Sequence, residues 1–155
     1  MNLLTIVKEN QEEIKDIAEK IFTEYAIKTH DSLFRMIELE FYWNSSSHAD
    51  NSTYLRKYVD PKSGEWFFHY SGVDIALRNE ETGGYGGILI RSIIDINSKE
   101  IFKGPQVCVM RLFSGSNAFG EFIQTKIVEH KFDNNPMIIS KPRKGLGDKA
   151  KKKWC

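Results

Sequence analysis

Cysteine is scarce in this chain of 155 residues, which contains only two. Cys108 lies within an apolar run and Cys155 stands at the last position. Two thiols so far apart in the sequence provide neither a disulfide framework nor the paired spacing that zinc ligands usually have. We therefore expect both cysteines to be free thiols.

Long apolar runs are absent as well. The apolar start of the chain is interrupted at once by Lys8 and Glu9, and no segment approaches the stretch of about 18 apolar residues that a membrane-spanning helix needs. The sequence therefore predicts neither a signal peptide nor a membrane contact. A cytoplasmic protein is the expectation that follows.

A charge of one sign is also lacking, because 22 basic and 21 acidic residues leave a formal net charge of +1. This value is too small to indicate binding to a polyanion by the chain as a whole. Acidic residues gather near the start and lysines near the end, where residues 141–155 have the composition of a basic, flexible tail. Any contact with nucleic acid must therefore depend on local patches.

The length and the residue pattern predict a single α+β domain that spans residues 1–155. Asn10 and Glu13 resemble a capping box, and apolar residues then recur at helical spacing, which predicts a helix over residues 11–25. Alternating or β-branched apolar segments predict strands over residues 25–29, 33–43, 66–70, 73–77, 87–94 and 107–113.

Acidic side chains alternate along the second predicted strand. In an extended chain Met36, Glu38, Glu40 and Tyr42 point to the same face. One of the two acids could lie in a cleft and act as a general base. The alternative is an exposed strand face whose glutamates are solvated.

Two histidines and two aspartates raise the possibility of a metal site. His48, Asp50, His69 and Asp74 are residue types that suit zinc or a non-haem metal, but their spacing is not diagnostic. The alternative is a loop histidine and a strand histidine with ordinary hydrogen-bond partners.

The aromatic run 66–70 has two faces. Trp66, Phe68 and Tyr70 lie on one face of an extended strand, and Phe67 and His69 lie on the other. One set is expected in the core, and the other could supply flat surfaces that stack on a base.

A glycine-rich segment and an isolated arginine follow. Residues 83–87 lack the lysine and serine of a phosphate-binding loop, so we expect a hairpin loop with Tyr85 at its tip. Arg91 interrupts an apolar strand and needs a partner when buried, which could be Glu40, Asp74 or a phosphate. A structural ion pair and an anion contact both remain open.

Taken together and in order, these motifs resemble the methylpurine (alkyladenine) DNA glycosylase family. Residues 18–22 resemble a helix of the family, and residues 37–42, Ile-Glu-Leu-Glu-Phe-Tyr, are similar to its Val-Glu-Thr-Glu-Ala-Tyr stretch. A loop histidine follows, here His48, and residues 66–72 resemble an aromatic strand that ends in Tyr-Gly. The other similar segments are 88–93, with the pattern Val-Leu-Leu-Arg-Ala in the family, Gly104-Pro105, and the late Pro-Arg-Lys-Gly of residues 142–145.

The resemblance implies a curved antiparallel sheet flanked by a few helices, and a monofunctional glycosylase that acts in base excision repair. Glu40 would activate the water that attacks the sugar. The extruded base would be held by a pocket formed by Tyr42, His48, His69, Tyr70 and Asp74. Phosphates would be contacted by Arg91, Arg143 and Lys144.

The partner implied by the resemblance is damaged double-stranded DNA, bound by a monomer without cofactor or metal. The second hypothesis is a non-catalytic protein of the same fold that binds a planar small molecule or nucleic acid, since a fold does not fix a function. The third is the metal-dependent hydrolase built on the histidines and aspartates above.

Overall fold

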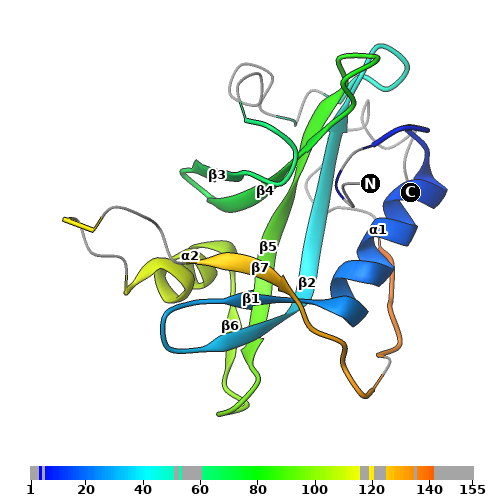
Figure 1. Cartoon of the computed structure of the whole chain (residues 1–155). Helices are drawn as coiled ribbons and strands as arrows, with labels where there is room; N and C mark the ends of the chain where they lie inside the picture. Colours follow the sequence, from blue (N-terminus) through cyan, green and yellow to red (C-terminus); the bar gives the residue numbers. More distant parts are fainter. Residues whose placement is uncertain are drawn as a thin grey trace.

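A computed structural model describes residues 4, 6–50, 53, 61–115, 119–120, 125–134 and 136–141 (Figure 1). The elements in chain order are α1 (Gln11–Glu24), β1 (Tyr25–Lys28), β2 (Leu33–Asn44), β3 (Trp66–His69), β4 (Gly72–Arg78), β5 (Tyr85–Asp95), β6 (Ile101–Lys103), α2 (Pro105–Phe113) and β7 (Lys126–Glu129).

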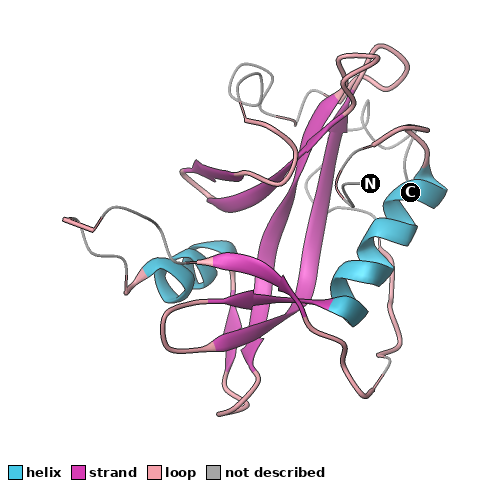
Figure 2. Ribbon diagram, in the orientation of Figure 1, coloured by secondary structure: helices cyan, strands magenta, loops and turns pink. Residues whose placement is uncertain are grey.

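The seven strands of the described residues belong to one antiparallel sheet, whose order is β3-β4-β5-β2-β1-β7, with β6 paired to β5. Figure 2 shows how the long strands β2 and β5 run through the molecule and how the sheet curls around them. Within the described residues two helices accompany this sheet. The expected α+β class, with one curled antiparallel sheet, is confirmed.

The first helix begins as the capping box predicts. The backbone N–H of Glu13 donates to Oδ1 of Asn10 at 2.9 Å. The Glu13 carboxylate also accepts hydrogen bonds from the preceding backbone amides of Val7, Lys8 and Glu9. The first contact satisfies an amide that a helix start leaves without a partner, and the other three fix the segment before the helix.

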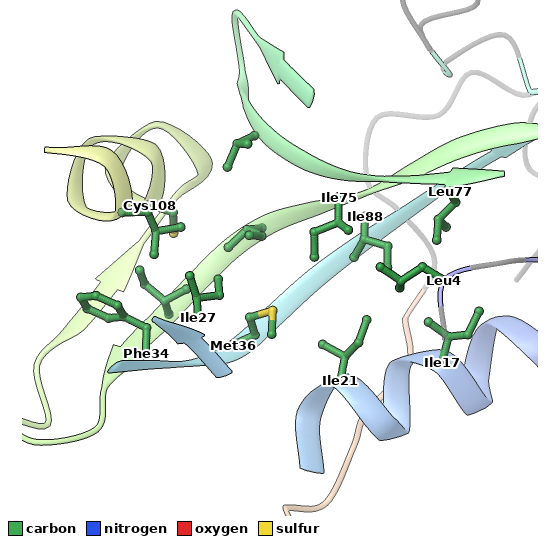
Figure 3. Close-up of a cluster of buried hydrophobic side chains, with 14 of the residues drawn as sticks. Leu4, Ile17, Ile21, Ile27, Phe34, Met36, Ile75, Leu77, Ile88 and Cys108 are labelled. Carbon is green, nitrogen blue, oxygen red and sulfur yellow. The ribbon is translucent and has the colours of Figure 1, made fainter. Parts of the chain in front are cut away.

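The core lies between α1, α2 and the central strands. Ile17 and Ile21 of α1 are buried one turn apart against the sheet (Figure 3). The largest side chains with less than 2% exposure come from α1, β1, β2, β4, β5, α2 and the segment before α1, namely Ile6, Ile21, Ile27, Phe34, Met36, Ile75, Leu77, Ile88, Ile90, Ile93 and Leu112. The long β2–β5 pair contributes five of them and is thus anchored in the core.

The pairing of β2 with β5 contains two register shifts, one between Met36 and Glu38 and one between Glu38 and Leu39. Such irregularities change the direction in which the side chains point. Met36 is fully buried, whereas Glu38 is exposed. The prediction that Met36 shares a face with the two glutamates was therefore wrong, because a strict alternation does not cross the shifts.

The segment 107–113 was predicted as a strand and is part of α2. Its β-branched and apolar residues favour a strand locally. However, Gly104 turns the chain with a φ of 102°, and Pro105 occupies the start of the helix, where proline is well tolerated. Cys108 and Leu112, one helical turn apart, are then both buried.

Tyr85 does not lie at a hairpin tip. It begins β5, where it pairs with Asn44 of β2 and Arg78 of β4. The turn lies before it, closed by the backbone hydrogen bond from Asn79 to the carbonyl oxygen of Gly84 at 2.9 Å.

In the part of the chain that the structure describes, no helix has the length and apolar character needed to cross a membrane.

We expect Glu9, in the segment before α1, to make the free energy of unfolding depend on pH. Partial burial, the largest single influence, raises the pKa of Glu9, but several hydrogen bonds outweigh it, so that the pKa is lowered overall. The donors are the side chains of Thr82, Ser45, Ser47 and Asn79. A carboxyl whose pKa is lower in the folded state stabilises the fold above its unfolded pKa and ceases to do so as the pH falls.

The Glu9→Gln variant should therefore lose part of its urea stability at neutral pH and approach the parent protein as the pH falls to about 3. Urea midpoints measured along a pH series test this. The matched control is Glu80→Gln. It removes an exposed acid from the β4–β5 turn, which also contains the donor Thr82. Equal pH dependence in the parent and in Glu9→Gln would contradict the expectation.

Candidate functional site

The strand register places polar residues from three strands on one face of the sheet. Asp74 of β4 lies opposite Leu89 of β5, and Leu89 lies opposite Glu40 of β2. Directly opposed residues point to the same face, and two strand spacings amount to about 10 Å. Glu40 and Asp74 are therefore neighbours across the buried Leu89.

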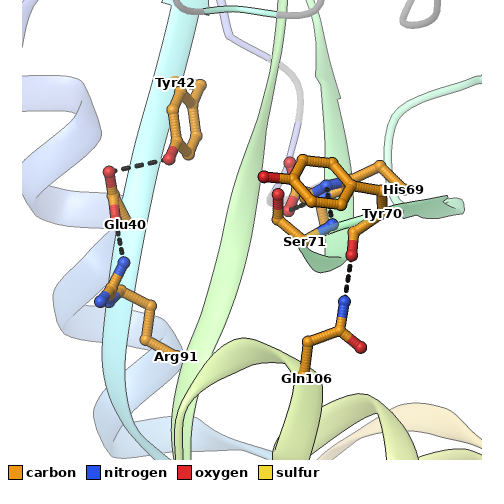
Figure 4. A network of polar contacts seen from close by, with 8 residues as sticks. Glu40, Tyr42, His69, Tyr70, Ser71, Arg91 and Gln106 are labelled. Atoms are coloured by element: carbon orange, nitrogen blue, oxygen red, sulfur yellow. Dashed lines mark hydrogen bonds and ion pairs between the residues drawn. The ribbon is translucent and has the colours of Figure 1, made fainter.

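Glu40 is held by two donors. Tyr42, two residues along the same strand, donates its hydroxyl to Oε1 at 2.8 Å, and Arg91 of β5 donates from Nη1 to Oε2 at 2.6 Å (Figure 4). The Glu40 side chain is 15% exposed. The carboxylate is therefore fixed in orientation and still reaches the surface of the sheet.

Arg91 lies between two acids. Besides the contact with Glu40, its Nε lies 3.5 Å from Oε1 of Glu38. Desolvation, the largest single influence, lowers the pKa of Arg91, but the hydrogen bond and charge of Glu40 and the charge of Glu38 raise it overall. The expected need for a partner is thus met by Glu40, one of the alternatives that the sequence left open.

Glu38 is the most exposed member of this group, with a side-chain exposure of 57%. Its Oε2 accepts a hydrogen bond from the hydroxyl of Ser92 at 2.7 Å. We call Glu38, Glu40, Tyr42 and Arg91 the carboxylate–arginine cluster.

His69 and Asp74 form a second polar unit. It lies across β5 from the carboxylate–arginine cluster. His69 Nε2 lies 3.0 Å from Asp74 Oδ1, and the two side chains are 3% and 0% exposed. The backbone N–H of Ser71 donates to His69 Nδ1 at 3.2 Å, so in the neutral imidazole the ring proton resides on Nε2 and is donated to Asp74. The pair therefore fixes the turn that joins β3 to β4.

This burial changes how the two residues could serve a base pocket. The resemblance placed His69 and Asp74 among the pocket walls, whereas the structure turns them toward each other and away from solvent. Phe67 stacks on the His69 ring with a centroid distance of 5.8 Å. The geometry thus points to an indirect effect, through the hairpin that they hold.

Replacing Asp74 with alanine should destabilise the protein by about 1–3 kcal/mol, because a buried N–H of His69 would lose its acceptor. Urea unfolding of the variant measures this loss. Asp74→Asn keeps an acceptor oxygen and should retain much of the stability. Equal losses in both variants would show that the hydrogen bond to His69 is not what matters.

Tyr70 lies in the turn after β3, and its side chain is turned outward, with an exposure of 86%. Its carbonyl oxygen accepts a hydrogen bond from the amide of Gln106 at the start of α2. Phe68 and Trp66 both pack edge-on against Phe113 of α2. In Figure 4, Tyr70 and His69 lie on one side of β5, and Glu40, Tyr42 and Arg91 lie on the other.

His48 lies in the loop after β2. Its backbone exchanges hydrogen bonds with Ser45, and the N–H of the nearby Asp50 donates to Oδ1 of Asn44. Among the described residues no group of three or more histidines, cysteines or acids could hold a metal. The metal hypothesis for His48, Asp50, His69 and Asp74 therefore has no geometric support.

Arg143 and Lys144 lie outside the described residues, together with most of the basic segment 141–155. A separate open depression of about 390 Å³ lies at the β1–β2 turn. It is lined by Lys28, Thr29, His30, Asp31, Ser32, Leu33, Asn97 and Val128.

Sequence reasoning found Glu40, Tyr42 and Arg91 but gave no role to Ser92 or Gln106. Ser92 follows Arg91 directly and lies opposite Glu38, which makes the hydrogen bond possible. This neighbour relation depends on the register of two strands, so neither strand alone reveals it. Gln106 lies just before the segment 107–113, which was predicted as a strand.

Comparison with known proteins adds one relative. An uncharacterized protein of Acanthamoeba polyphaga mimivirus is 28% identical over 179 aligned residues, which cover 90% of this chain and 81% of that protein. No family model matches the chain, and no solved structure matches it. The viral protein is itself uncharacterized, so the similarity assigns no function to this chain.

Proposed function

We propose that this protein hydrolyses the N-glycosidic bond of a modified purine in DNA, with an alkylated base as the preferred leaving group. The observation that carries the proposal is the contact of Glu40 with both Tyr42 and Arg91 on one face of the sheet. These are the residues to which the resemblance gives the reactive acid, a pocket wall and the phosphate contact.

Glu40 is the reactive group in this proposal. Its carboxylate accepts a proton from a water molecule as the water oxygen bonds to the sugar carbon C1′. The bond between C1′ and the base nitrogen breaks, and its electron pair leaves with the base. A cationic alkylated purine departs as a neutral molecule, so the reaction needs no acid to protonate it.

Positive charge develops on the sugar in such a reaction, and a fixed carboxylate stabilises it. The two donors on Glu40 support this role because they hold the carboxylate at one place before the substrate binds. Preorganisation of this kind lowers the barrier, since no reorganisation is needed during the reaction.

The aromatic residues have different places in this proposal. The Tyr42 ring, next to Glu40, is suited to contact an extruded base, with His48 as a further wall. The exposed Tyr70 ring lies across β5 and is suited to stack where the base leaves the duplex, because an extruded base leaves a gap that flat side chains can fill.

The test is base release from duplexes that carry alkylated, deaminated or unmodified purines, scored by strand scission after alkali. We expect release from the alkylated duplex and none from the unmodified one. Absence of release from every duplex would overturn the proposal and favour a non-catalytic binder of a planar ligand.

A further inference from the structure

The two acids that contact Arg91 are bound in different ways. Glu40 accepts a hydrogen bond of 2.6 Å from Nη1, whereas Glu38 lies 3.5 Å from Nε. The side chains differ in exposure as well, at 15% for Glu40 and 57% for Glu38. Glu40 is thus held closely, and Glu38 is held loosely at the solvent side.

Glu38 also has a hydrogen-bond partner other than Arg91. The Ser92 hydroxyl donates to its Oε2 at 2.7 Å. Glu38 can therefore leave the guanidinium and keep a hydrogen bond. This arrangement suits a carboxylate that occupies its place only until another anion arrives.

The guanidinium presents Nε and Nη2 along one edge, and such an edge can bind a carboxylate or a phosphate through paired hydrogen bonds. Glu38 approaches only the Nε end of that edge. Within the described residues, Nη2 of Arg91 makes no hydrogen bond, and the Arg91 side chain is 39% exposed. An anion with two oxygens could therefore span the edge once Glu38 leaves it.

We propose that Glu38 is an internal occupant of the anion-binding edge of Arg91, and that a phosphodiester of the DNA displaces it when substrate binds. The identity of the anion as a DNA phosphate rests on the proposed function. Glu38 then sets how tightly DNA is bound, while Nη1 of Arg91 keeps its hydrogen bond to Glu40 throughout.

This role predicts the direction in which the affinity for DNA changes when Glu38 is replaced. The negative charge of Glu38 opposes an approaching phosphate, so the phosphate must compete for the edge. Removing that charge should strengthen binding. If Glu38 instead served to orient Arg91 and Glu40, its removal would weaken both binding and base release.

The test compares Glu38→Gln with the parent protein in binding to a duplex that carries a stable abasic analogue. We expect the Kd to fall about three- to fivefold, which corresponds to the strength of an exposed ion pair. With an alkylated duplex, the gain should appear as a lower KM. A fall in kcat, or weaker binding, would overturn the proposal.

Two further variants make the comparison specific. Glu129→Gln in β7 changes the net charge by the same amount away from the site, and it should change the Kd clearly less. Glu38→Asp keeps the charge but shortens its reach to Arg91, so its Kd should fall between those of the parent and Glu38→Gln. Equal effects of the Glu38→Gln and Glu129→Gln changes would also overturn the proposal.

A measurement without catalysis separates this proposal from the proposed function. The Arg91 Nε–H resonance can be assigned by its loss in Arg91→Lys and followed by NMR while a short undamaged duplex is added. We expect a saturable shift, with a midpoint at lower DNA concentration in Glu38→Gln. Such a shift without any base release would leave the Glu38 proposal intact and defeat the glycosylase, whereas no shift would overturn the Glu38 proposal.

Discussion

Base release should fall about 100- to 10,000-fold when Glu40 is replaced by glutamine, which is the range expected for the loss of a general base. Glutamine has nearly the same shape. Its oxygen can accept the hydrogen bond from Arg91, and its NH2 group can donate to the hydroxyl oxygen of Tyr42. It cannot accept a proton from water, however, and it carries no charge to stabilise the sugar cation. Single-turnover rates on an alkylated duplex measure the effect.

Binding serves as the control for this variant. Affinity for a duplex with a stable abasic analogue should remain within about threefold of the parent value, because Arg91, which contacts the phosphate in this proposal, keeps its charge. Loss of binding together with loss of release would mean that Glu40 acts mainly by holding Arg91. A Glu40→Gln variant that releases bases at the parent rate would remove Glu40 from the reaction.

Elements with strong local signals were predicted closely. The helix expected over residues 11–25 is α1, Gln11–Glu24, because the cap and the apolar spacing agree there. The strand expected over residues 33–43 is β2, Leu33–Asn44. The short strands β6 and β7 were not predicted, because each has only two apolar residues, which are adjacent and show no alternation.

The helix α2 was missed because local preference and tertiary context disagree. Val107 and Val109 favour a strand, yet the helix is fixed by Pro105 at its start and by burial of Cys108 and Leu112. A proline directly after a glycine, followed by apolar residues four apart, was the signal that could have indicated a helix.

Only part of the site was predicted from the sequence, because some of its contacts depend on how the strands pair. Alternation along one strand placed Glu38, Glu40 and Tyr42 together, and the cost of burying an unpaired charge indicated that Arg91 needs a partner. The choice of Glu40 over Asp74 depends on pairing between strands. Asp74 is already bonded to His69, which only the register of β3 and β4 determines.

The close pairing of β2 with β5 leads to the largest stability effect that we expect. Gly86 lies opposite Trp43, and a Cβ atom at this glycine would overlap the carbonyl oxygen of Tyr42 and come within 2.9 Å of its carbonyl carbon. A backbone neighbour cannot rotate away as a side chain can. Gly86→Ala should therefore force the strands apart and destabilise the protein by about 3 kcal/mol or more.

Urea unfolding compares this variant with Gly115→Ala, where a new Cβ would meet no atom within 4 Å and stability should change little. Tyr42 is the residue that holds Glu40, so displacement of its backbone should also disturb the reactive carboxylate. Under conditions where Gly86→Ala remains folded, base release should thus fall more than in Gly115→Ala. Parent-like stability of Gly86→Ala would contradict the close approach of the two strands on which the geometry of the site depends.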